Sequence, residues 1–138
     1  MRSFTSSPSR TVSLSNGAES VEFTVKRPPL LFHDILNRAF PIHDDDNDGE
    51  KGYRLSLRVV LIAAEGIRAT EGLPPRPEVS AGEAAWQAHA EEIAQIFSDA
   101  GLLDTHLNQL AAAVRDLQNG KVDGKAPLAG ELDRAGND

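Results

Sequence analysis

Residues 52–69, GYRLSLRVVLIAAEGIRA, are the most apolar part of the chain and decide its fold. Their hydrophobic side chains recur at three- and four-residue spacing, the period of a helix with a buried face. That face carries Tyr53, Leu57, Val60, Leu61, Ala64 and Ile67, and Leu55, Val59 and Ile62 widen it. The first residues also alternate like a strand, but the apolar run continues beyond strand length. We therefore predict a central helix that is covered on more than one side.

Two segments upstream, residues 11–15 and 20–26, alternate apolar and polar side chains, as strands with one buried face do. Asn16 and Gly17 lie between them and tolerate the positive φ of a tight turn, so we predict an antiparallel hairpin. Its apolar face carries Val12, Leu14, Val21, Phe23 and Val25. An isolated hairpin is marginally stable in water, so this face is expected to pack on the helices. The alternative is a flexible N-terminal arm.

A first helix is predicted between the hairpin and the central helix. Residues 30–40 carry apolar side chains at helical spacing, and Pro41 ends the segment. On the other side of the central helix, residues 72–77, GLPPRP, contain too much proline for a helix or a central strand. We expect residues 72–77 to be a stiff linker.

Two further helices are predicted after the linker. Ser80 and Glu83 have the spacing of a capping box, with Ser80 as the N-cap, and Gly101 suits the C-terminal end of that helix. The last helix spans about residues 104–118. The predicted buried stripes are Trp86, Ala90, Ile93 and Phe97 in the third helix, and Leu107, Leu110, Ala111, Val114 and Leu117 in the last.

The chain has 138 residues, which suits one domain with one hydrophobic core. The predicted fold class is mainly α (α+β), with an N-terminal β-hairpin followed by about four helices over residues 11–120. We expect residues 1–10 to be a flexible N-terminus. Residues 121–138, rich in glycine and aspartate, are expected to be a disordered tail.

Composition and motifs exclude several classes of function. The net charge of −7 and the lack of a basic run argue against binding to nucleic acid. The chain has no cysteine, which excludes disulfides, thiolate zinc sites and a cysteine nucleophile. No phosphate-binding loop, dinucleotide fingerprint or nucleophile elbow is present, so we expect neither an enzyme nor a cofactor. Residues 59–64, the longest apolar run, are too short to cross a membrane, and a cytoplasmic location is expected.

The acidic segment HDDDNDGE, residues 43–50, is the one candidate for metal binding. Asp44, Asp46 and Asp48 occupy positions 1, 3 and 5 of a calcium loop, and Gly49 occupies position 6. Position 12, where such a loop needs a bidentate glutamate, is Leu55. We therefore expect a solvated hinge before the central helix. Weak or partner-completed cation binding is the alternative.

The order of these parts resembles that of the tail assembly chaperones of long-tailed bacteriophages. The resemblance covers about residues 11–118. It lies in the hairpin, the Lys-Arg-Pro exit at residues 26–28, the helix rich in small residues at 58–66, and a final helix pair that contains LNQLAAA at 107–113. It implies a non-enzymatic assembly factor, often oligomeric, that coats the apolar tape-measure protein and recruits tail-tube subunits.

The apolar helix faces suit shielding of partner helices, and the negative charge suits keeping a complex in solution. The expected contacts with partners or other subunits are Leu31, Phe32, Ile35, Phe40, Trp86 and Phe97, which can equally belong to the core. Two other functions remain open. One is a structural virion protein, such as a head–tail connector or neck subunit, and the other is a weak calcium-binding interaction module.

Overall fold

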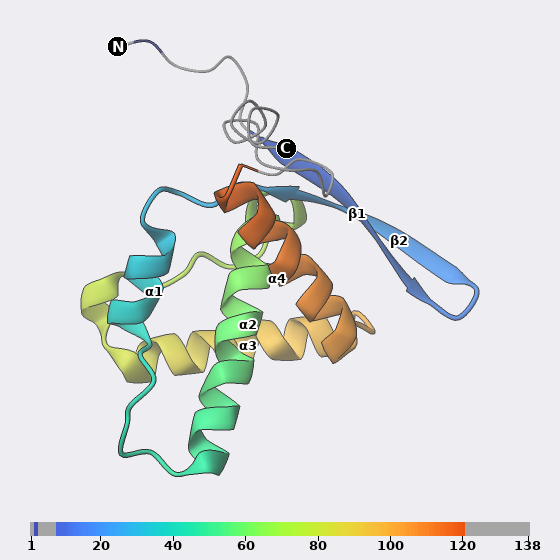
Figure 1. Ribbon diagram of the computed structural model, residues 1–138. Helices are drawn as coiled ribbons and strands as arrows, with labels where there is room; N and C mark the ends of the chain where they lie inside the picture. The colour runs from blue at the N-terminus through green and yellow to red at the C-terminus, as the bar shows by residue number, and fades with distance from the viewer. Residues whose placement is uncertain (1, 3–7, 121–138) are drawn as a thin grey trace, which may run out of the picture.

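The computed structural model describes residue 2 and residues 8–120 of the chain. Within them, a β-hairpin is followed by four α-helices and one short 3-10 turn (Figure 1). The predicted mainly α architecture with an N-terminal hairpin is therefore confirmed. The predicted disordered tail, residues 121–138, lies outside the described residues, as does most of the predicted flexible N-terminus.

The hairpin consists of β1 (Ser9–Asn16) and β2 (Glu19–Lys26), which pair antiparallel. Asn16 lies opposite Glu19, so the turn has two central residues, and the first of them, Gly17, has a φ of 67°. Glycine with positive φ at this position is typical of a type II′ turn. Strand β1 starts at Ser9, two residues before the predicted start, because its pairing with β2 continues to Lys26.

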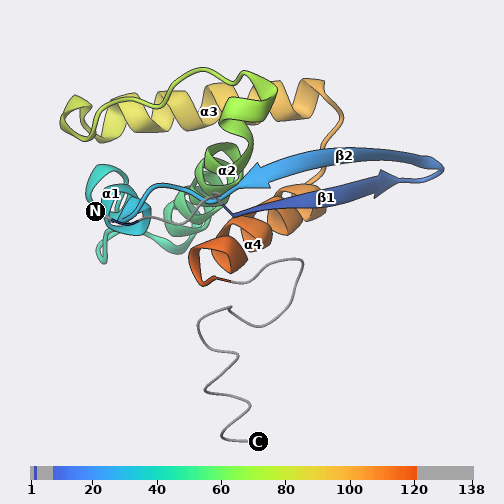
Figure 2. The ribbon, with the colours of Figure 1, turned by 90° about the horizontal axis from the view of Figure 1, so that it is seen from above.

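The predicted apolar face of the hairpin packs on α2 and α4. Leu14 and Val25 are buried, and Val12 and Phe23 are partly buried against the same core. Val21 is 55% exposed, because the turn end of the hairpin projects beyond the helices (Figures 1 and 2). The hairpin is thus held against the helices by Val25, near the end opposite the turn, and by Leu14 of β1.

The central helix, α2 (Asp48–Glu71), crosses the middle of the molecule and contacts β2, α3 and α4 (Figure 1). Its covering on several sides is confirmed, since residues 60–64 are all buried. Tyr53 and Leu55 were expected on the covered side, but they are 49% and 53% exposed. The helix also starts four residues earlier than predicted, because Asn47 caps it: its Oδ1 accepts a hydrogen bond from Glu50 N–H at 2.9 Å.

The first helix, α1 (Phe32–Ala39), is shorter than the predicted 30–40. Leu31 precedes it with a φ of 64°, a left-handed conformation that a helix cannot contain. Arg58 of α2 fixes the other end, because its guanidinium donates hydrogen bonds to the carbonyl oxygens of Phe40 at 2.6 Å and Leu36 at 3.4 Å. Leu36 O also accepts the Phe40 N–H at 2.8 Å, and the Phe40 carbonyl is among those that a helix end leaves without an intrahelical partner.

The last two helices are α3 (Glu83–Asp99) and α4 (Asp104–Gln118), and both predicted apolar stripes are buried. The predicted capping box is wrong. Ser80 lies in the 3-10 turn Val79–Ala81, Gly82 is the N-cap of α3, and no side chain caps this helix. Glu83 instead turns toward His43 and Arg54.

The linker between α2 and α3 has no regular structure over residues 73–78, as its prolines predict. Its backbone is held at two points, since Arg68 donates a hydrogen bond to Pro74 O, and Trp86 Nε1 donates one to Glu78 O at 2.9 Å. Across residues 8–120, none of the helices combines the length and apolar character that a membrane span requires.

Candidate functional site

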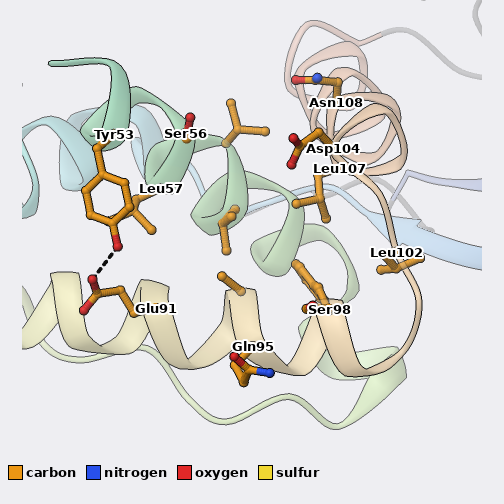
Figure 3. A pocket seen from close by; sticks show the side chains of 14 residues that line it. Tyr53, Ser56, Leu57, Glu91, Gln95, Ser98, Leu102, Asp104, Leu107 and Asn108 are labelled. Atoms are coloured by element: carbon orange, nitrogen blue, oxygen red, sulfur yellow. Dashed lines mark hydrogen bonds between the residues drawn. The ribbon is translucent and has the colours of Figure 1, made fainter. Parts of the chain in front are cut away.

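A groove of about 720 Å³ lies between α2, α3 and α4 (Figure 3). Its lining divides cleanly by exposure. The apolar residues are buried or partly buried and form the floor: Leu57, Val59, Val60, Ala94, Phe97, Leu102 and Leu107. The polar residues are all exposed and form the rim: Tyr53, Ser56, Glu91, Gln95, Ser98, Asp104 and Asn108.

Helical periodicity explains how this groove arises from the sequence. On α3, Glu91, Ala94, Gln95 and Ser98 follow the i, i+3, i+4, i+7 spacing of one helix face. On α2, Tyr53, Ser56, Leu57 and Val60 repeat the same spacing. Two faces with small or medium side chains therefore oppose each other without filling the space between them. The first turn of α4 and the residues before it close the end farthest from Tyr53 (Figure 3).

Tyr53 and Glu91 bridge the two long walls of the groove at its other end (Figure 3). The Tyr53 hydroxyl donates a hydrogen bond to Glu91 Oε2. This bond to the carboxylate, together with partial burial and the nearby negative charge, raises the pKa of Tyr53 above its ordinary value. The phenol thus acts as a hydrogen-bond donor between α2 and α3.

The groove combines an apolar floor with a polar rim. Its lining contains no histidine, lysine, arginine or cysteine. The charged side chains of the lining, Glu91 and Asp104, are both acidic. An apolar floor with an acidic rim favours an apolar ligand flanked by cationic groups.

The three aspartates of the half calcium loop do not converge. Asp44 is exposed in the loop, and Asp48 is the first residue of α2. Asp46 is directed to Arg54, with 3.4 Å between Oδ2 and Nε. No group of three possible metal ligands occurs within the described part of the chain. The expected solvated hinge is thus shorter than predicted, because Asp48 and Glu50 already belong to the first turn of α2, where acidic side chains favour a helix start.

The residues that were expected to contact partners have different environments. In the described conformation, Phe32, Phe40 and Trp86 are at most 1% exposed and belong to the core. Ile35 packs partly buried against the same core. Phe97 lines the floor of the groove, and Leu31 is 69% exposed at the start of α1. Of this set, only Phe97 lies in the groove.

A polar cluster around His43 joins the acidic segment to α3. His43 Nε2 lies 3.0 Å from Glu83 Oε2 and 3.1 Å from Glu83 Oε1. Arg54 of α2 joins the same carboxylate at 3.5 Å and lies over the Phe40 ring, 4.8 Å from its centroid. The hydrogen bond and charge of Glu83 raise the pKa of His43. No local pattern predicts this cluster, because His43 and Glu83 are 40 positions apart.

A second polar cluster holds the proline linker against α2 and α3. Glu65 Oε1 lies 3.2 Å from Arg76 Nε and 3.7 Å from Arg68 Nη2. Arg68 also contacts His89 Nε2 at 3.3 Å. Burial, and the neighbouring Arg68 charge, lower the pKa of His89. Each charge here has a partner inside the protein, so the cluster serves the fold.

Comparisons with known proteins give no relative for this chain. No protein-family model matches it, and no significant match was found among curated proteins or solved structures.

Proposed function

We propose that this chain is a non-enzymatic assembly chaperone of a phage tail, which binds helical segments of the tape-measure protein in the α2–α3–α4 groove. The observation that carries this proposal is the division of the groove into a buried apolar floor and an exposed polar rim. An amphipathic helix that lays its apolar face into a groove needs such a surface.

The charge of the rim specifies the partner segment further. Glu91 and Asp104 contribute negative charge, and no lining residue contributes positive charge. A segment with an apolar stripe flanked by lysine or arginine is therefore favoured over an acidic one. The net charge of −7 would keep such a complex in solution by repulsion between copies.

The order of hairpin and helices supports the finer assignment to phage tail assembly, since it resembles that of the tail assembly chaperones. In that role the chain acts in the cytoplasm of the host bacterium, binds tape-measure and tail-tube proteins, and oligomerises. The rival role, a connector or neck subunit, makes a different prediction, because such a protein stays in the mature particle. Mass spectrometry of purified particles separates the two: a stoichiometric amount of this chain there contradicts the chaperone proposal.

The direct test looks for a tape-measure gene beside the gene for this chain and uses fragments of its product. We expect co-expression to keep them soluble and titration calorimetry to detect binding. A variant with Ser56→Arg and Ser98→Arg should abolish both effects, because it places two long cationic side chains on opposite walls of the groove. Neither serine hydroxyl makes a hydrogen bond within residues 8–120, and both residues are exposed, so the fold should tolerate the change.

The matched control carries the same two arginines elsewhere on the same helices. Ala69→Arg on α2 and Ala88→Arg on α3 change exposed residues outside the groove lining. We expect this control to bind as the natural chain does. Equal loss of binding in both variants, or none in the groove variant, would mean that the groove is not the binding site. Insoluble tape-measure fragments and no heat of binding would remove the chaperone role itself.

A further inference from the structure

The outer edge of β1 is a row of backbone hydrogen-bonding groups that do not bond to β2. Arg27 N–H donates to Pro8 O at 3.2 Å, so this pair, one step beyond Ser9 and Lys26, is a hydrogen-bonded pair of the hairpin. Such pairs alternate with pairs whose groups point outward. The N–H and C=O groups of Ser9, Thr11, Ser13 and Ser15 therefore point away from β2.

Two side-chain contacts bear out this assignment. Ser15 O, which should point outward, accepts a hydrogen bond from His106 Nε2 of α4 at 2.8 Å. Thr24 O, which should point outward from β2, accepts one from Thr70 Oγ1 of α2 at 3.0 Å. The β2 edge is thus occupied by α2 at Thr24, and the β1 edge is occupied by α4 at Ser15. On β1, the backbone groups of Ser9, Thr11 and Ser13 have no hydrogen-bond partner within residues 8–120.

This free edge has space beside it. A second hollow, of about 340 Å³, lies between residues 10–13 of β1 and α4, where Gln109, Ala112, Ala113 and Asp116 line it. Figure 2 shows β1 on the α4 side of the hairpin. Exposed strand edges are usually blunted by lysine, proline or a bulge. Residues 9–16 contain no lysine or proline, and their pairing with β2 is unbroken.

The sequence of this edge is self-complementary. If two β1 strands pair antiparallel about Thr11, each Thr11 lies opposite Thr11 of the partner subunit, and Ser9 lies opposite Ser13 of the partner subunit. Hydroxyl side chains then face each other across the two strands on the outer surface. Such cross-strand pairs of serine and threonine are favourable. The one charged side chain of the segment, Arg10, lies opposite Val12 of the partner subunit, so no like charges meet.

We propose that a second copy of this chain docks on the β1 edge, so that β2, β1 and the two corresponding strands of the partner form one continuous four-stranded sheet. The contact is isologous, as a twofold dimer requires. None of its strand residues lines the α2–α3–α4 groove, so loss of this dimer can be distinguished from loss of binding in the groove.

Sedimentation equilibrium of the full chain tests the dimer and its register. The natural chain should sediment at twice the mass of one chain. Thr11→Lys places two lysines opposite each other and should raise the dissociation constant about two- to fivefold. The control, Thr24→Lys, adds the same charge to the same outer face directly across the hairpin but away from the interface, and should leave dimerisation unchanged.

A mixture of two variants with opposite charges at residue 11 tests the register. Its outcome does not depend on whether either substitution alone weakens the fold. Thr11→Glu alone should also weaken the dimer, whereas an equimolar mixture of Thr11→Glu and Thr11→Lys chains should restore it, because opposite charges then meet. In the natural dimer, the Thr11 and Ser13 amides should exchange with deuterium more slowly at high concentration than at low. A monomer at all concentrations, equal effects of Thr11→Lys and Thr24→Lys, or no restoration in the mixture would each overturn the proposal.

Discussion

Gly66 of α2 lies so close to Val25 of β2 that a β-carbon on residue 66 would come within 2.8 Å of Val25 Cγ1. Val114 of α4 approaches the same position from another side. Gly66→Ala should therefore destabilise the protein by about 1–3 kcal/mol through overpacking. This outcome opposes helix propensity, by which alanine would stabilise the helix by about 0.5–1 kcal/mol. Urea unfolding followed by far-UV circular dichroism measures the difference.

Gly52 provides the matched control for that experiment. It lies in the same helix, and a β-carbon there meets nothing within 4 Å. Gly52→Ala should therefore show the propensity effect alone and raise the free energy of unfolding by up to about 1 kcal/mol. If both substitutions stabilise, the three elements do not pack at Gly66 as closely as the structure shows.

The hairpin and the helix stripes could be predicted because their signals are local. Asn16 and Gly17 mark the turn, and the spacing of residues such as Trp86 and Phe97 marks the buried side of α3. The start of α2 could not be predicted because acidic residues such as Asp48 and Glu50 are as common in a solvated loop as in the first turn of a helix. Their helical state depends on the cap from Asn47 and on the cation of Arg54, which compensates Asp46.

The groove could not be predicted for a different reason. Each of its walls has an ordinary amphipathic pattern, and nothing in that pattern says whether the facing helix fills the space. Tyr53 was assigned to the covered face by its spacing from Leu57, yet it lies on the rim and bonds to Glu91. Partnerships between distant residues, such as Tyr53 with Glu91 across 38 positions and Ser15 with His106 across 91 positions, depend on the placement of whole elements.

Asn47 should contribute measurably to stability through its cap on α2. Its side chain satisfies the Glu50 N–H, one of the amides that have no partner inside the helix. Asn47→Ala should lower the free energy of unfolding by about 1 kcal/mol, as measured by urea unfolding. Asp45→Ala is the control, since Asp45 is exposed in the same loop and outside the helix, and its effect should stay within about 0.5 kcal/mol.

Calcium should not stabilise the chain at millimolar concentration. Asp46 is held by Arg54, and Asp48 lies in the first turn of α2, so the carboxylates do not surround one position. A thermal melt with and without calcium should give the same midpoint, because a ligand that binds the folded state would raise it. A calcium-dependent rise that disappears in Asp44→Asn would instead show that the loop rearranges around an ion.

The contact between His43 and Glu83 should make stability depend on pH in a defined direction. Glu83, by its hydrogen bond and then its charge, raises the pKa of His43, with a smaller contribution from Asp46 and opposition from burial and Arg54. Because the folded-state pKa lies above the ordinary 6.5, the stabilisation is complete below that value and is lost as the pH rises through the folded-state pKa. The melting temperature should therefore fall more on His43→Gln substitution at about pH 5.5 than at about pH 8.5.

The same contact can be read directly from the His43 ring protons by NMR titration. The His43 pKa should lie above its ordinary value in the natural chain and return toward it in Glu83→Gln, since the charge is removed and a neutral amide oxygen is a weaker acceptor than a carboxylate. Asp46→Asn is the control and should lower the pKa by less, because Asp46 acts on His43 through charge alone. An unshifted His43, or equal effects of the two substitutions, would mean that the acidic segment is not tied to α3 by this pair in solution.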